Sequence, residues 1–309
     1  MRVSFIESLL FILVAFLASC NSEPTHGLKL RLQIEEGQEF DMRVTEEVLA
    51  KRLKDFGVEV LKIDPMNGNT IDLEIAASKP IPQERLVDLL QTQGKLEFYH
   101  TFNADKLFGF LLEANNILKD SLADVEPISS LFVKDNFRAR NVLCKVRQEN
   151  KEKMMQYLEQ KQVRALLPTD LRFVKFLWGT PDENGNVPLY AIKGNRANRA
   201  VLDGNTIIEA SQDFDMMGNP TINLQMNEQG AMKWEDITGR ASREQTNIAM
   251  VVDHTVLSAP GVLNGAIVGG RSQITGEFTV EEAYDLAAII EAGALPKLKV
   301  SSMTVIKLQ

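Results

Sequence analysis

The triplet Gly269-Gly270-Arg271 comes nearest to a phosphate-binding loop, because two glycines and a cation precede an apolar helical pattern. Such a loop holds its anion with free N–H groups at a helix N-terminus. Here residues 271–278 separate the glycines from the helix that starts near Thr279, and no Lys-Ser or Lys-Thr pair follows them. We therefore predict a bend between two short strands, at which glycine adopts a positive φ. Arg271 is then a hydrogen-bond donor at the surface or within the fold.

The histidines and cysteines of the sequence form no recognisable catalytic or metal-binding pattern. His26, His100 and His254 lie in unrelated segments, without an H-E-x-x-H motif. The two cysteines, Cys20 and Cys144, do not form a C-x-x-C pair, and the apolar setting of Cys144 favours a buried thiol. No G-x-S-x-G nucleophile elbow occurs. The sequence therefore favours a protein without catalytic residues, metal ligands or a cofactor.

The composition is typical of a globular protein of about two domains, with 44% hydrophobic and 25% charged residues among 309. The formal net charge is -8. Nucleic acids and anionic membrane surfaces attract cationic proteins. The charge therefore argues against a nucleic-acid partner and against electrostatic attachment to a membrane.

The N-terminus has the features of a secretory signal. The apolar run Leu9–Ala18 is about half the length that a membrane span requires, which is about 20 residues. Residues 17–20, L-A-S-C, resemble the bacterial lipobox, in which the cysteine is diacylated and becomes the first residue of the mature protein. We predict lipidation of Cys20 and a lipid anchor in the membrane. The alternative is an uncleaved anchor with an incidental cysteine, which Glu7 keeps open.

The first folded region is predicted to be ferredoxin-like. Residues 1–20 are assigned to the signal peptide, 21–27 to a tether and 28–102 to this region, which we call the base. Its strands are expected at 28–34, 58–63, 70–75 and 95–102, and its helices at 44–56 and within 80–94. The order is β-α-β-β-α-β, which is the split arrangement of a ferredoxin-like fold.

The middle segment, residues 103–198, is treated as an insert of uncertain structure. Helical patterns occur at 104–120 and 149–162. Two apolar stretches, 171–179 and 187–194, are predicted to form a hairpin with Asn184-Gly185 in the turn.

The last region, 199–296, is predicted to be a second α+β unit, followed by a tail at 297–309. The stretch 221–226 alternates as a strand, and Asn227 can cap the following helix. A strand hairpin is expected around Asp253-His254. Thr279 and Glu282 have the spacing of a capping box.

Several of these segments carry a family resemblance. Residues 201–238, 248–262 with the tripeptide S-A-P, and 269–296 resemble the head subdomain of SecD, a membrane subunit of the bacterial protein-export machinery. Residues 46–58 and 94–102 resemble the base of the same periplasmic domain, whereas the insert matches only loosely. The resemblance implies an α+β protein with a ferredoxin-like base, an insert and a SecD head-like subdomain.

The resemblance also implies a function. In SecD the periplasmic domain lies between the first two transmembrane helices, whereas the fourteen residues after Leu295 are too few and too polar to span a bilayer. We therefore expect a non-catalytic domain, tethered in the cell envelope and facing the periplasm. Its implied partners are unfolded or translocating polypeptide and Sec translocon subunits. The alternative is an envelope lipoprotein that keeps the fold as a structural or interaction module without an export role.

Polypeptide binding requires exposed apolar groups next to polar ones. Met216, Met217 and Val262 lie in predicted loops and are the candidates, together with Arg271. Methionine side chains suit adaptable contacts. The alternative is that these apolar side chains pack under their loops.

Overall fold

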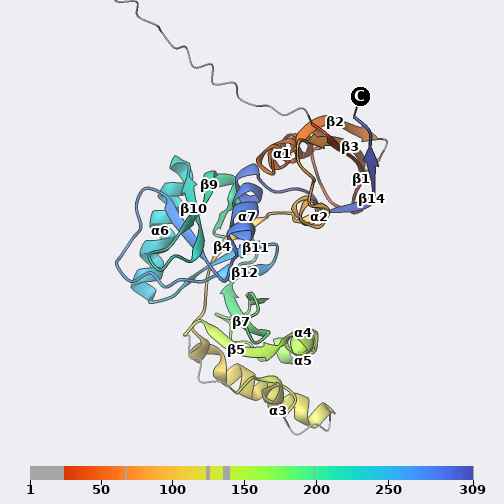
Figure 1. The fold of residues 1–309 in the computed structure, drawn as a ribbon. Coiled ribbons are helices and arrows are strands. Elements are labelled where there is room, and N and C mark those ends of the chain that lie inside the picture. The colour runs from red at the N-terminus through yellow and green to blue at the C-terminus, as the bar shows by residue number, and fades with distance from the viewer. Residues whose placement is uncertain (1–23, 67, 123–125, 135–139, 198, 309) are drawn as a thin grey trace, which may run out of the picture.

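The computed structural model describes residues 24–66, 68–122, 126–134, 140–197 and 199–308. The predicted signal peptide and Cys20 lie outside this part of the chain. The described residues form three lobes, which together contain four antiparallel sheets (Figure 1). The predicted α+β class is confirmed.

The base is a four-stranded sheet with two helices on one face. Its helices are α1 (Met42–Asp55) and α2 (Gln83–Gln91). Its strands are β1 (His26–Ile34), β2 (Glu59–Met66), β3 (Thr70–Ala77) and β14 (Leu298–Ile306), in the order β14-β1-β3-β2. On β1 the buried side chains are Leu28, Leu30, Leu32 and Ile34, which face the helices across one core. The intervening positions Lys29 and Arg31 pair with acidic side chains of β3 on the open face.

The fourth strand of the base differs from the sequence-based expectation. The strand expected at 95–102 is β4 (Leu96–His100), and it belongs to another lobe. All five residues of β4 are buried, so this strand needs packing layers on both faces, which the base does not supply. The segment expected to be a tail instead provides β14, so the ferredoxin-like strand order is completed by the C-terminal residues. The other two lobes are therefore inserted into the base between α2 and β14.

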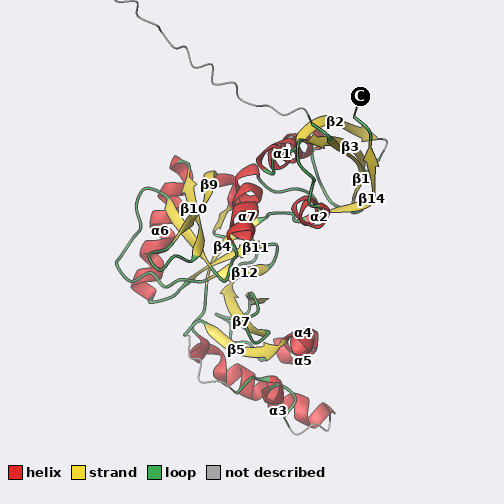
Figure 2. Ribbon diagram, viewed as in Figure 1, coloured by secondary structure: helices red, strands yellow, loops and turns green. Residues whose placement is uncertain are grey.

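The head contains two sheets and two helices. One sheet has the order β12-β11-β4-β8 and the other has the order β13-β10-β9. The additional strands are β8 (Leu202–Asp203), β9 (Ile207–Phe214), β10 (Pro220–Met226), β11 (Ile248–Val252), β12 (Thr255–Ser258) and β13 (Arg271–Thr275). Helix α6 (Glu228–Glu244) lies on the outer side, and α7 (Val280–Ala292) lies between the head strands and the base (Figure 2).

The local signals of the head are confirmed. The Asn227 side chain accepts a hydrogen bond from the N–H of Gly230 at 2.8 Å, which caps α6. Thr279 and Glu282 form the predicted capping box of α7. The turn between β11 and β12 has a positive φ at both Asp253 and His254, which matches the right-handed twist of a tight hairpin.

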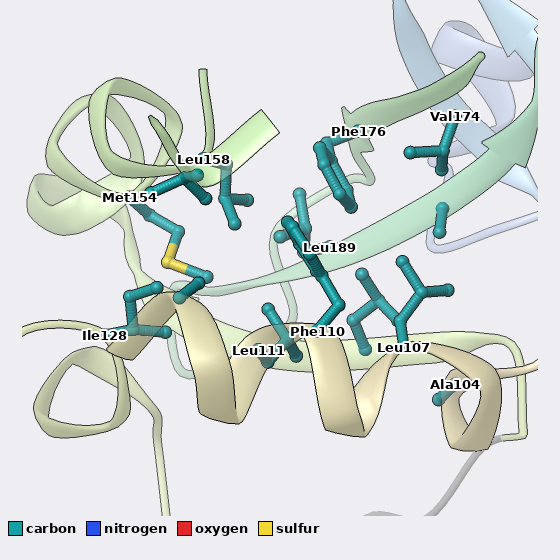
Figure 3. Close-up of a cluster of buried hydrophobic side chains, with 14 of the residues drawn as sticks. Ala104, Leu107, Phe110, Leu111, Ile128, Met154, Leu158, Val174, Phe176 and Leu189 are labelled. Carbon is teal, nitrogen blue, oxygen red and sulfur yellow. The ribbon is translucent and has the colours of Figure 1, made fainter. Parts of the chain in front are cut away.

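The insert has a hydrophobic core of its own. The helices and strands of the insert are α3 (Phe108–Leu122), β5 (Val142–Arg147), α4 (Lys151–Leu158), α5 (Lys161–Arg164), β6 (Val174–Trp178) and β7 (Asn186–Lys193). The sheet order is β5-β7-β6, and the predicted β6–β7 hairpin turns at Gly185, where φ is +72°. Figure 3 shows Phe110 of α3 directed toward Phe176 and Leu189 of this sheet, with the two phenyl rings stacked at a centroid distance of 6.0 Å.

The chain crosses between base and head twice, and Arg52 of α1 holds both crossings. Its guanidinium donates to the carbonyls of Leu89, Thr92 and Gln93 before β4, and to that of Gly293 after α7. The Arg52 side chain is fully buried, and burial lowers its pKa to about 9, so the group remains charged at neutral pH. This junction fixes the geometry of the two linkers.

Candidate binding cleft in the head

A cavity of about 710 Å³ lies in the head between β13 and the segment that follows β12. Its lining combines both sheets of the head with α6: Glu209, Ser211, Asn223, Leu224, Gln225, Trp234, Ile248, Met250, Pro260, Gly261, Val262, Ile267, Arg271, Ser272, Gln273 and Thr275. The size is within the range of pockets that hold small ligands or short peptide segments. We call it the head cleft.

One wall of the head cleft is polar. It is the face of the sheet β13-β10-β9 that carries the odd-numbered residues of β10. The Gln273 amide donates to the Asn223 carbonyl oxygen at 2.9 Å, and the Arg271 Nε donates to the Gln225 oxygen at 3.3 Å. These side-chain bonds run across strands and hold the amide groups in fixed positions.

The other wall is apolar. Trp234, Met250 and Val262 belong to the buried core of the head, together with Ile222, Leu224 and Met226 of β10 and Ile274 of β13. Trp234 packs edge-on against Phe98 of β4 with ring centroids 5.3 Å apart, a favourable aromatic arrangement. The head cleft therefore presents apolar and polar surfaces on opposite sides of β13.

The glycine pair lies at the entrance to β13 and forms the predicted bend. Gly269 and Gly270 have φ values of +80° and +67°. A Cβ added at Gly270 would lie 2.8 Å from the Cβ of Ala231, so α6 packs against this glycine. The helix that follows β13 begins nine residues after Gly270, at the Thr279 cap, so the glycines are not at a helix N-terminus. The prediction that Gly269 and Gly270 form a bend leading into a strand is confirmed.

The four candidate binding residues fall into two groups. Arg271 is exposed and Val262 is only 9% exposed, and both line the head cleft. Val262 thus differs from the expectation of an exposed side chain, because it packs against the core under its loop. Met216 and Met217 are 106% and 84% exposed at the tip of the β9–β10 hairpin. The structure does not bring these methionines to the head cleft.

The hairpin tip is held in a defined conformation. The Asp215 carboxylate accepts hydrogen bonds from the N–H groups of Met217 and Asn219, at 2.8 and 2.9 Å. The side-chain amide of Asn219 also donates to this carboxylate at 2.9 Å; this bond is the main cause of the lowered pKa of Asp215, and the backbone bonds add to it. Phe214 is half-exposed beside the two methionines. The tip is therefore an ordered apolar projection at a distance from the head cleft.

The histidines and the described cysteine lie apart from each other. His100 is buried on β4, where burial lowers its pKa to about 4, so it is neutral at pH 7. His254 lies in the β11–β12 turn and His26 at the start of β1. Cys144 is partly buried against the core of the insert, and desolvation raises the pKa of its thiol to about 12, which disfavours the reactive thiolate. Among the described residues no group of three or more histidine, cysteine or acidic side chains could hold a metal ion.

Sequence reasoning missed Gln273 and the residues around it as cleft-forming groups. The sequence around Ser272-Gln273-Ile274 indicates a strand, and Ile274 is its one buried residue, but nothing in the local pattern says that this strand forms a sheet edge beside a cavity. That arrangement depends on Trp234, whose indole donates to the Arg271 carbonyl from 37 positions away in the sequence.

The head is an α+β module, and a known family model matches this part of the chain. Residues 184–297 match the family described as SecDF, P1 head subdomain. The resemblance to SecD that the sequence indicates is thereby confirmed.

Individual relatives and solved structures agree. The chain is 39% identical over 141 residues to protein translocase subunit SecD of Rhodothermus marinus, covering 45% of this chain and 22% of the relative. It is 41% identical over 98 residues to SecD of Magnetococcus marinus, covering 32% and 18%. A crystal structure of SecDF in a super-membrane-facing form matches with a TM-score of 0.55 at 20% identity, over 91% of this chain and 30% of that chain. A structure of SecDF, described as a membrane component that enhances protein export, matches with a TM-score of 0.52 at 20% identity, over 90% of this chain and 100% of that chain.

The similarity covers a limited part of the relatives. The chain spans roughly a fifth of the length of the SecD proteins named here. At 20% identity, the structural matches show that the fold is shared. Within the described residues, no helix combines the length and the apolar composition needed to cross a bilayer.

Proposed function

We propose that this protein is a non-catalytic accessory of protein export that binds translocating polypeptide through its head, with Sec translocon subunits as further partners. The match of residues 184–297 to the SecDF P1 head subdomain carries this proposal. The head cleft supports it, because a cavity with one apolar and one polar wall suits an unfolded segment that exposes both kinds of side chain.

The proposal includes a location. The lipobox-like residues 17–20 support a lipid anchor on Cys20, which would hold the domain at the membrane surface on the periplasmic side. A surface-bound domain meets a chain emerging from the translocon at a high effective concentration.

A direct binding experiment tests the polypeptide part of the proposal. The full chain is mixed with a reduced, carboxymethylated polypeptide and with the same polypeptide in its native, disulfide-bonded form. We expect the full chain to bind and retain the unfolded form and not the native form. Equal retention of both forms, or of neither, contradicts the proposed function.

A second experiment tests the partners. The lipidated protein is isolated from native membranes after cross-linking, and the co-purifying proteins are identified. Translocase subunits and nascent exported chains are expected. Recovery of outer-membrane assembly proteins alone, together with normal secretion when the protein is deleted, supports the alternative of an envelope lipoprotein that acts as an interaction module.

A further inference from the structure

The outer edge of β13 is an unpaired sheet edge inside the head cleft. In the sheet β13-β10-β9 this strand has a neighbour on one side only. The N–H of Met226 donates to the carbonyl of Gly270 at 2.9 Å, and such bonded pairs recur at every second residue of an antiparallel ladder. Ser272 and Ile274 therefore direct their backbone groups toward β10.

The intervening residues direct their backbone groups away from β10. At one end the Arg271 carbonyl accepts a hydrogen bond from the Trp234 indole at 3.2 Å. At the other end the hydroxyls of Thr275 and Ser258 are 3.2 Å apart. Between them, no group of the described residues bonds to the outward N–H and C=O of Gln273. This unpaired amide and carbonyl lie on a strand that lines the cavity.

The opposite edge of the same sheet is blocked. The outward N–H of Ala210 on β9 donates to the Glu291 carboxylate at 3.1 Å, and that of Phe214 donates to the Asp213 carboxylate at 2.8 Å. The ladder between β9 and β10 also contains a register shift, whereas the ladder between β13 and β10 is regular. Proteins commonly protect exposed edges with such bulges and charges. The edge of β13 lacks these two protections.

The surroundings of this edge define what could pair with it. A strand added beside β13 would alternate its side chains between the two walls. One wall offers Trp234, Met250 and Val262, and the other offers the amides of Asn223 and Gln273. An extended segment with alternating apolar and polar residues satisfies both walls at once.

The charge of the head cleft further limits which polypeptide segments can pair with β13. Its charged lining residues are Glu209 and Arg271, which both lie opposite Gln225 in the two ladders, so the charges of the lining cancel in a chain of net charge -8. A charged segment would gain no net counter-charge and would lose hydration on entering the cleft. An uncharged segment matches the lining.

We propose that the head binds an extended, uncharged segment of another polypeptide as an additional β-strand along the outer edge of β13, with backbone hydrogen bonds to Gln273. The proposal rests on the proposed function, because it specifies how translocating polypeptide is held. Backbone pairing supplies affinity that does not depend on sequence, and the two walls select alternating, uncharged stretches.

The test uses a fluorescein-labelled ten-residue peptide in which valine alternates with threonine, and an analogue that is N-methylated at every second residue. Fluorescence anisotropy with the full chain measures the Kd of each. Methylation on the bonding face removes the N–H groups that pair with β13, so at least a tenfold weaker Kd is expected. Gln273→Pro removes the outward N–H of this residue of β13 without removing a bond to β10. It should weaken the binding of the unmodified peptide, measured as its Kd, by a similar factor.

Gln212→Pro is the matched control. Gln212 lies on β9, where the register also directs its backbone N–H outward, away from β10. This variant should bind the peptide as the unaltered chain does. Far-UV circular dichroism establishes that both variants are folded, and the methylated peptide tests the proposal even if Gln273→Pro fails to fold.

The outcomes separate this inference from the proposed function. Equal Kd values for the plain and methylated peptides, in a chain that still retains the carboxymethylated polypeptide, overturn strand addition and leave the proposed function intact. Failure to retain any unfolded polypeptide overturns both. A concentration-dependent dimer in sedimentation that Gln273→Pro dissolves would show that the edge pairs with a second copy, which also overturns the proposal.

Discussion

Replacing Arg52 with methionine should destabilise the base strongly, because one buried side chain holds both crossings between base and head. Its guanidinium donates to four carbonyls, those of Leu89, Thr92, Gln93 and Gly293. Methionine preserves much of the aliphatic length of arginine and removes all of these donors. The substitution therefore removes hydrogen bonds and changes the packed volume little.

The magnitude follows from the number of carbonyls that lose their donor. An unsatisfied buried group costs about 1–3 kcal/mol. Leu89 is buried, whereas Thr92, Gln93 and Gly293 are partly exposed and only partly reached by water, so we count the equivalent of two of the four carbonyls as unsatisfied. The expected loss is then about 3 kcal/mol. For a unit of 60–100 residues this corresponds to a fall in Tm of roughly 12–24 °C.

The assay is a thermal melt followed by far-UV circular dichroism, at neutral pH where Arg52 is charged. Arg31→Met is the matched control, because Arg31 is exposed and makes a two-pronged ion pair with Asp72 on the open face of the base. Exposed ion pairs add little to stability, so this variant should melt close to the unaltered chain. Equal Tm values for Arg52→Met and the unaltered chain would refute the reasoning.

Four further predictions concern single residues. Asn227→Ala removes the N-cap of α6 and should cost about 1 kcal/mol in urea unfolding, whereas no loss would contradict a capping role. The folded-state pKa of His100, about 4, lies below its ordinary value of 6.5. Its contribution to stability should therefore be complete above pH 6.5 and be lost as the pH falls toward 4, and His100→Gln should show a shallower loss over that window. Cys144 is partly buried and its pKa is raised to about 12, so it should react with a thiol reagent at pH 8 much more slowly in the folded protein than after denaturation, and equal rates would contradict this interpretation. Cys20→Ala should abolish incorporation of labelled palmitate and release the protein from membranes; continued labelling would contradict the lipobox interpretation.

The sequence predicts those features that depend on a few neighbouring residues. The capping box at Thr279 and Glu282 forms as expected, because its bonds of 2.8 and 3.1 Å join groups three positions apart. The bend at Gly269 and Gly270 and the hairpin turn at Gly185 likewise depend on backbone conformations that glycine favours locally.

Features that depend on distant partners were not predictable in this way. The strand β14 has an irregular pattern of exposure, because a register shift near Ser301 interrupts its alternation against β1. Its place in the base follows from pairing with a strand at the other end of the chain. The burial of Val262 similarly results from packing against the head core, although its local sequence indicates a loop. The head cleft itself exists only once β13 and the segment after β12 lie side by side.

The completion of the base by β14 imposes an order on folding. The Ser301 hydroxyl bonds to the Arg31 carbonyl across 270 positions of the chain. Contacts of such separation form late, because the loop between the partners must close first. During synthesis the head and insert can acquire their own cores while β1 still exposes the edge that β14 will cover. Until β14 has been synthesised, the nascent chain therefore keeps one edge of β1 unpaired, and an unpaired edge of this kind can pair wrongly with a strand of another chain.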